Sequence, residues 1–167
     1  MNFWKIYING LNVKIWNYYR GTRDGLESKD FHQKCNNQGP TISLIKNDKG
    51  HIFGGYASIS WTSERANKNA PKSFLFTLTN IHNTQPTKFP SKNNGKEVYH
   101  EPSYGPIFGE DGHDFYIQSK FTEKSHGYSI FPKSFQDSLG KGKSIFTSDI
   151  NSDYFSIQEI EVFKVKK

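Results

Sequence analysis

Four ionisable side chains are the candidates for acid–base chemistry in this sequence: Asp24, His113, Asp114 and Glu161. A carboxylate or an imidazole catalyses proton transfer only within hydrogen-bond reach of the reacting group. Asp24 lies early in the chain, Glu161 near its end and the His113–Asp114 pair between them, so only the fold could bring all four into one cleft. If it does, the chain would be a hydrolase or a redox-protective enzyme of unknown type.

Each of these side chains also has a structural interpretation. Asp24 is followed by Gly25, and an Asp-Gly pair is typical of a turn. Glu161 belongs to the terminal stretch "QEIEVF", in which polar and apolar residues alternate as they do on a half-buried strand. The acidic segment around His113 matches no calcium loop and is typical of a solvated turn. The sequence therefore favours scaffolding roles, and no catalytic residue is assigned.

Thiol chemistry depends on Cys35, the single cysteine of the chain. A peroxide-reducing enzyme would need it as a reactive thiolate, and His32 is near it in sequence. Cys35 also shares a predicted helical face with Phe31, where a thiol behaves as a small hydrophobic residue, and this is the interpretation we favour. One cysteine forms no internal disulfide and excludes a cysteine-based zinc site. The histidines form no H-x-x-x-H or H-x-H pair, so no metal or cofactor is expected.

The segment "GKGKS", residues 140–144, ends like a phosphate-binding loop. Such a loop has a glycine five positions before its second glycine, so that successive backbone amides can surround a phosphate. Here that position is Asp137, whose negative charge would repel the ligand. No apolar helical pattern follows Ser144, so a nucleotide site is not expected.

The net charge of +6 at pH 7 is dispersed, because basic residues are interleaved with acidic ones along the chain. A nucleic-acid interface would need a stripe of Lys and Arg with stacking aromatic residues on one face, and we expect none. No apolar run approaches the roughly 20 residues that cross a bilayer. The start "MNFWKIYING" also lacks the apolar region and cleavage site of a signal peptide. These features predict no transmembrane segment and a cytoplasmic, intracellular location.

The elements that would position the candidate residues are short strands. Strand-like stretches rich in aromatic and β-branched residues recur at residues 41–46, 51–61, 73–80, 96–101, 113–118 and 154–165. Asn9-Gly10 predicts a β-hairpin between strands at residues 4–8 and 11–20, and Ser28 is the predicted N-cap of a two-turn helix. Residues 119–153 are expected to form long loops with one or two brief strands. Short strands separated by Gly, Pro and Asn predict a mainly β fold in one domain of residues 1–167, a two-sheet antiparallel β-sandwich flanked by short helices.

Two glycines, Gly54 and Gly55, interrupt the strand-like stretch "HIFGGYASISW". Glycine weakens a strand interior because it has no side chain to pack. We expect a bulge at this point, or a place where another main chain or a large ring, such as Trp61 or a phenylalanine, packs against bare backbone. Binding of a ligand there is the alternative.

Several stretches together resemble one family. They are "YYRGTRDGLESKDFHQKCNNQGPTISLIKNDKGHIFGGYASISW", "SFLFTLTN", "PSYGPIFG", "HDFYI" and "FSIQEIEVFKV". In content, order and spacing they are similar to the TLDc domain, and more narrowly to its short, lysine- and asparagine-rich versions found in protists. The resemblance covers residues 16–165 and leaves residues 1–15 as an atypical N-terminal segment.

The resemblance implies a β-sandwich flanked by short helices. It also implies a non-catalytic interaction domain linked to protection against oxidative damage, since several members bind the vacuolar proton-pumping ATPase and influence its assembly. No cofactor or catalytic residue comes with the family. This chain departs from it at Glu110 and Asp111, which stand where members often have a run of glycines, and the role of that loop is open at this point.

Overall fold

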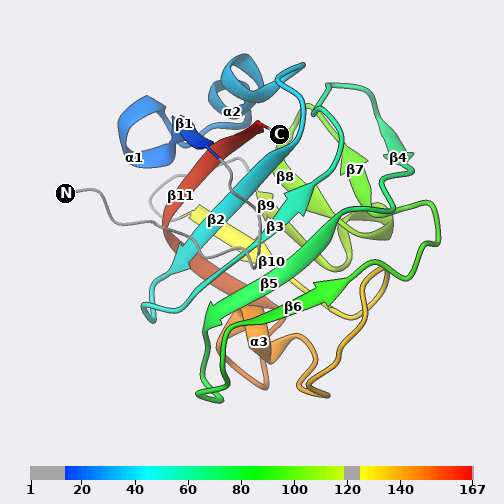
Figure 1. Ribbon diagram of the computed structural model, residues 1–167. Coiled ribbons are helices and arrows are strands. Elements are labelled where there is room, and N and C mark those ends of the chain that lie inside the picture. Colours follow the sequence, from blue (N-terminus) through cyan, green and yellow to red (C-terminus); the bar gives the residue numbers. More distant parts are fainter. Residues whose placement is uncertain (1–13, 119–124, 167) are drawn as a thin grey trace.

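The computed structural model of the protein describes residues 14–118 and 125–166, in which the chain is mainly antiparallel β-structure (Figure 1). The predicted fold class is confirmed. Within the described residues, ten of eleven strands follow one hydrogen-bonded path in the order β4-β7-β8-β9-β10-β11-β2-β3-β5-β6, and the eleventh, β1, pairs with β11 off this path. The strands are β1 Lys14–Arg20, β2 Thr41–Asn47, β3 Ile52–Ala57, β4 Ala66–Lys68, β5 Phe74–Thr79, β6 Thr87–Pro90, β7 Val98–His100, β8 Tyr104–Phe108, β9 Phe115–Gln118, β10 Ser125–Tyr128 and β11 Tyr154–Lys166.

Strand β11 belongs to both layers of the molecule. Its first residues pair with β10, whereas its later residues pair with β2 on one edge and with β1 on the other. Its register against β2 shifts between Ile157 and Glu159, and such an irregularity lets a strand bend and twist. The two expected layers are therefore halves of one continuous hydrogen-bonded path. A strand of 13 residues is long enough to serve both halves.

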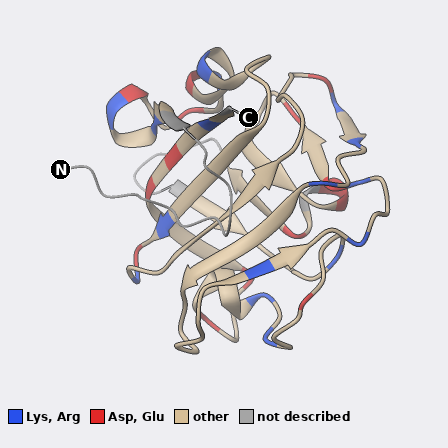
Figure 2. Cartoon of the chain, in the orientation of Figure 1, with Lys and Arg blue, Asp and Glu red and all other residues tan. Residues whose placement is uncertain are grey.

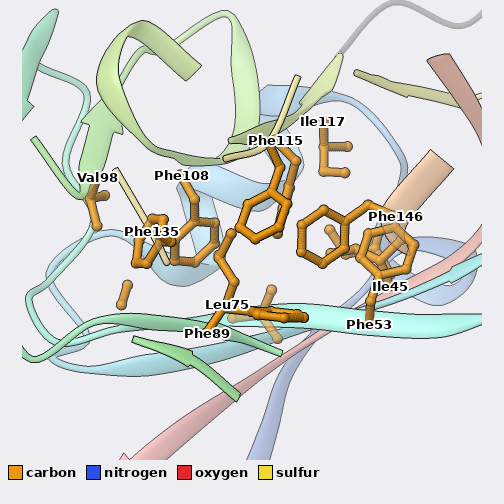
Figure 3. Packing of buried hydrophobic residues seen from close by; sticks show 14 of the residues in the cluster. Ile45, Phe53, Leu75, Phe89, Val98, Phe108, Phe115, Ile117, Phe135 and Phe146 are labelled. Atoms are coloured by element: carbon orange, nitrogen blue, oxygen red, sulfur yellow. The ribbon is translucent and has the colours of Figure 1, made fainter. Parts of the chain in front are cut away.

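The main core lies between the two layers and consists largely of aromatic rings (Figure 3). Phe53 of β3 meets Phe115 of β9 across the interface, with ring centroids 5.8 Å apart and edge-to-face geometry. Trp61 is 1% exposed, and its indole N–H donates to Thr41 Oγ1 at 2.8 Å. Large rings fill this space because the sequence has few aliphatic side chains and each ring removes a large apolar area from water.

The glycines of β3 lie where other groups approach the bare backbone. A Cβ atom on Gly55 would stand 2.5–2.8 Å from three ring carbons of Phe108, on β8 of the opposite layer. A Cβ atom on Gly54 would meet the carbonyl oxygen of Ser43 at 2.0 Å and the ring of Phe76 at 2.8 Å. The pairing register of β3 with β2 is regular through both glycines, so no bulge lies there. Packing of the opposite layer explains Gly55, and crowding by the neighbouring strands β2 and β5 of its own layer explains Gly54.

A second apolar cluster lies on the other face of the β2–β3–β5 layer. Ile42, Leu44, Phe74, Phe76 and Phe163 form it, and all five are buried. Alternation along β2 sends successive side chains to opposite faces, and both faces of this strand are buried. That double burial accounts for the nearly continuous apolar run "TISLI" in the sequence.

Short helices lie at the two ends of the layers, with α1 and α2 at one end and α3 at the other (Figure 1). They are α1 Gly21–Asp24, α2 Ser28–Cys35, α3 Ser144–Thr147 and the single 3₁₀ turn η1 Glu110–Gly112. The N-cap of α2 is Glu27, in a capping box with Asp30, and not Ser28 as expected. The predicted hairpin at Asn9-Gly10 lies outside the described residues. Within residues 14–118 and 125–166, no helix is long and apolar enough to cross a membrane.

Candidate functional site

Asp24 and Glu161 lie in one network of charged groups where α1, β1 and β11 meet. Arg20 Nε is 2.9 Å from Glu161 Oε1 and 3.3 Å from Glu159 Oε2, and its backbone N–H donates to Asp24 Oδ2 at 2.9 Å. Arg23 also pairs with Asp24, with Nη2 2.6 Å from Oδ2. The fold thus brings two of the four candidate residues together, but it surrounds both with donors.

This environment fixes Asp24 in its charged form. The hydrogen bond and positive charge of Arg23 lower the pKa of the Asp24 carboxyl to about 2. A carboxylate with such a low pKa is a weak proton acceptor near neutral pH. Gly25 ends α1 with φ 110°, and its carbonyl accepts a hydrogen bond from Tyr19 Oη at 2.7 Å. The Asp24-Gly25 pair therefore works as a local brace between α1 and β1.

Asp114 and His113 are neighbours in sequence but face different surroundings. Asp114 is fully buried, and its two carboxylate oxygens accept the backbone N–H groups of Lys133 and Ser134 at 2.8 and 2.7 Å. Burial raises the pKa of this carboxyl to about 6, against the opposing effect of those two amides. His113 is half-exposed and lines a surface groove. The four candidate residues therefore occupy three environments: Asp24 and Glu161 lie in the Arg20 network, Asp114 is buried against backbone amides, and His113 lines the groove.

The "GKGKS" segment forms a turn that is closed by the chain itself. The carboxylate of Asp137 accepts the backbone N–H groups of Leu139, Gly140 and Gly142 at 3.1, 2.9 and 2.7 Å. These amides resemble those of an anion-binding nest, but the carboxylate of Asp137 already occupies the place of the anion. Asp137 therefore stabilises this loop.

The thiol of Cys35 is enclosed in the main core. Cys35 is 0% exposed and belongs to the same cluster as Phe31 and Trp61. Burial raises the pKa of the thiol to about 12. Since the thiolate is the nucleophile in peroxide and disulfide chemistry, Cys35 acts as a core residue. Within the described part of the chain, no group of three or more His, Cys, Asp or Glu side chains is placed to hold a metal ion.

A groove of about 490 Å³ crosses the outer face of the β7–β11 layer, and tyrosine rings form much of its wall. Tyr116, Tyr128 and Tyr154 are direct cross-strand partners on β9, β10 and β11. Their rings are in contact, with centroids 5.1 Å apart for Tyr116–Tyr128 and 5.2 Å apart for Tyr128–Tyr154. Tyr104 of β8 meets Tyr116 at 5.2 Å, edge-to-face. We call these four residues the tyrosine row.

The remaining wall of the groove carries negative charge. Glu101 and Asp111 line it together with His113, Ile107 and Tyr99, and no Lys or Arg is among the described lining residues. Asp111 is exposed and takes a left-handed backbone conformation, with φ 51° and ψ 27°. Asp and Asn tolerate this region better than most residues, so Asp111 can occupy a position that glycine would also fit. Asp111 and Asn67 exchange two hydrogen bonds, at 3.0 and 3.2 Å, that hold this loop against β4.

Sequence reasoning missed the tyrosine row, although part of its signal is visible. In "FYI", Phe115 and Ile117 enter the core while Tyr116 points outward, and in "YF" the same holds for Phe155 and Tyr154. Alternation shows that each tyrosine faces solvent on its own strand. It does not show that three strands place their tyrosines in register, because pairing between distant segments is a property of the fold.

Comparisons with known proteins agree with the architecture. A family model described as the TLDc domain matches residues 9–166, beginning earlier than the expected residue 16. The chain is 41% identical over 44 residues to the zebrafish (Danio rerio) MTOR-associated protein MEAK7, which is 26% of this chain and 10% of that protein. It is 29% identical over 81 residues to the mouse (Mus musculus) protein of the same name, which is 44% of this chain and 18% of that protein. The chain thus matches only a small part of either relative.

Proposed function

The chain belongs to the TLDc domain family, and we propose that it acts as a non-catalytic protein-interaction domain in the cytoplasm. One observation carries the proposal: the acidic candidates Asp24 and Asp114 are each tied to arginine or to backbone amides, whereas a row of tyrosines faces solvent. A binding surface needs exposed groups that a partner can cover, and tyrosine is enriched at such surfaces. The charged groups of the fold stabilise the domain, and the exposed rings are free to bind.

More specifically, we propose a role in protection against oxidative damage, exercised through binding to the vacuolar proton-pumping ATPase. The family resemblance supports this role. The relatives named above are described as associated with mTOR, which supports protein association as the mode of action. The buried thiol of Cys35 supports an indirect protective role, because a shielded thiol of raised pKa reacts slowly with peroxide.

A direct binding measurement tests this function. The purified chain is immobilised and exposed to the isolated peripheral sector of the vacuolar proton pump, with excess free chain as competitor. We expect saturable binding that the free chain abolishes. Absence of saturable binding would contradict the proposed pump interaction. Absence of any competed partner after cross-linking in cell extract would contradict the interaction function itself.

A further inference from the structure

We propose that the tyrosine-lined groove on the β7–β11 layer is a docking site for an extended, arginine- or lysine-bearing segment of a partner protein. The inference rests on the proposed interaction function and adds to it a surface and the chemistry of the partner. Three observations support this docking site: the alignment of the tyrosine row, the sign of the charges around the groove and the length of the row.

The tyrosine row offers aromatic surface that is already ordered. Tyr154 is 57% exposed and meets the half-buried Tyr128 edge-to-face, and Tyr128 stacks on the half-buried Tyr116 with an interplanar angle of 26°. Each ring is supported by its neighbour, so little side-chain freedom remains to be lost on binding. The faces of tyrosine rings attract ammonium and guanidinium groups. A cationic side chain is therefore well matched to this surface.

The charge of the groove is opposite to that of the whole chain. The protein carries +6 at pH 7, and Figure 2 shows Lys and Arg distributed among Asp and Glu over the view. The described groove wall nevertheless carries Glu101 and Asp111 and neither Lys nor Arg. Glu101 is partly neutralised by Arg65, whose Nε lies 3.5 Å from Oε1. Asp111 forms no ion pair within the described residues, and its carboxylate, which accepts one hydrogen bond from Asn67 Nδ2 at 3.0 Å, can accept another from a basic partner.

The length of the tyrosine row fits a short extended peptide. It spans four neighbouring strands, β8 to β11, and strands are about 4.8 Å apart, which makes the row roughly 15 Å long. An extended chain advances about 3.3 Å per residue, so four or five residues cover it. Alternate side chains of such a segment face the same way. Basic residues at every second position would meet the rings, with small residues between them.

The test uses a fluorescein-labelled peptide of alternating arginine and glycine and measures its anisotropy with the purified full chain. A glutamate–glycine peptide and an uncharged proline-rich peptide of equal length serve as competitors. We expect the arginine–glycine peptide to bind more tightly than either competitor. Its affinity should fall as the salt concentration is raised, because salt screens the ion pairs.

Tyr154→Ala should weaken binding of this peptide by about threefold to tenfold, and Tyr154→Phe should bind it as the wild type does, since the ring face remains. Asp111→Asn should weaken binding by about twofold to fivefold.

Matched controls lie outside the groove. Tyr18→Ala on β1 removes another partly exposed ring, and Asp149→Asn removes an exposed carboxylate of the loop before β11. Both should leave the affinity unchanged. Equal binding of the arginine and glutamate peptides, preference for the proline-rich peptide, or wild-type affinity of Tyr154→Ala would each overturn the proposal. If such a result occurs while the chain still binds the proton pump, the groove assignment fails and the interaction function stands.

Discussion

Asp114 is a buried carboxylate whose main partners are backbone amides. Its oxygens hold the N–H groups of Lys133 and Ser134, and a Cβ atom on Gly109 would lie 2.0 Å from Oδ2, so the loop before β9 is shaped around this side chain. The adjoining His113 lines the surface groove instead. A sequence pair that suggests an acid and a base is thus divided between the interior and the groove.

Asp114→Ala should destabilise the protein by about 1–3 kcal/mol, because two amides lose their acceptor and Ser134 is buried. Urea unfolding at neutral pH measures this change. The control is Asp149→Ala, where an exposed carboxylate accepts the backbone N–H of Asn151 at 2.8 Å, and its effect should stay within about 0.5 kcal/mol. Equal losses of stability in the two variants would show that the hydrogen bonds from residues 133–134 to Asp114 contribute nothing.

His100 is a buried imidazole that resists protonation. It is 2% exposed, Nδ1 lies 2.7 Å from Thr62 Oγ1, and Nε2 has no hydrogen-bond partner among the described residues. Burial, with a further effect of Lys68, lowers the pKa of His100 to about 4. In the unfolded chain the pKa of histidine is about 6.5. Protons therefore bind His100 more readily in the unfolded chain than in the folded one. The contribution of His100 to the stability is constant above pH 6.5 and falls as the pH drops toward 4.

The comparison of wild type with His100→Phe isolates this effect. The variant keeps a ring against Trp61, which lies 5.6 Å from His100 between centroids, but it cannot be protonated. Between pH 6.5 and 4 the wild type should lose on the order of 2 kcal/mol more stability than the variant. The raised pKa of Asp114 acts in the opposite direction in both proteins and cancels in the difference. Parallel stability curves over this pH range would contradict the assignment.

Cys35 should be inert in the native protein. Its thiol is fully buried and its pKa is raised to about 12 by burial. A thiol reagent that changes absorbance on reaction should label it only after urea unfolding. Peroxide consumption by the purified chain should be the same for wild type and Cys35→Ser. Rapid labelling of the folded chain, or loss of peroxide consumption in Cys35→Ser, would instead support the redox-enzyme alternative.

At the scale of single elements, Gly55 of β3 marks a close approach between the two layers. Alanine at this position would place a methyl group against the ring of Phe108. We expect Gly55→Ala to cost about 1–3 kcal/mol, the usual range for overpacking a close-packed core. Gly105→Ala on β8 is the control, since its nearest neighbour, Ile117 Cβ, would be 3.3 Å away. Thermal unfolding of both variants measures the difference, and an equal effect would mean that the layers can separate here at little cost.

The elements that the sequence predicts best are those with strong local patterns. The stretches at residues 41–46, 73–80 and 154–165 correspond to β2, β5 and β11, because their large apolar residues fill a core face. Strand β8 was not predicted, because Gly105 and Pro106 interrupt its strand-like pattern. Neither were strands β4 and β6. They have three and four residues, and their pairing with β7 and β5 supplies stability that no local pattern shows. The same holds for α3, a single turn of four buried residues.

At the scale of the whole molecule, the sequence predicts two layers but not their connection. Alternation identifies β11 as a half-buried strand. Which partners it takes along its 13 residues depends on β1, β2 and β10. The candidate site likewise depends on pairing between segments that are distant in the sequence. Asp24 and Glu161 both contact Arg20 because α1 and β1 lie on β11, and the tyrosine row exists because β8, β9, β10 and β11 are neighbouring strands.

If the protein acts by binding a partner through the tyrosine-lined groove, while the charged clusters stabilise the fold, binding should protect the strands of the groove. Hydrogen exchange of the chain, free and bound to the peripheral sector of the vacuolar proton pump, tests it directly. The account predicts slower exchange in β8, β9, β10 and the first residues of β11, with no change in α1. Protection confined to α1 and the later residues of β11, or none in the groove strands, would contradict it.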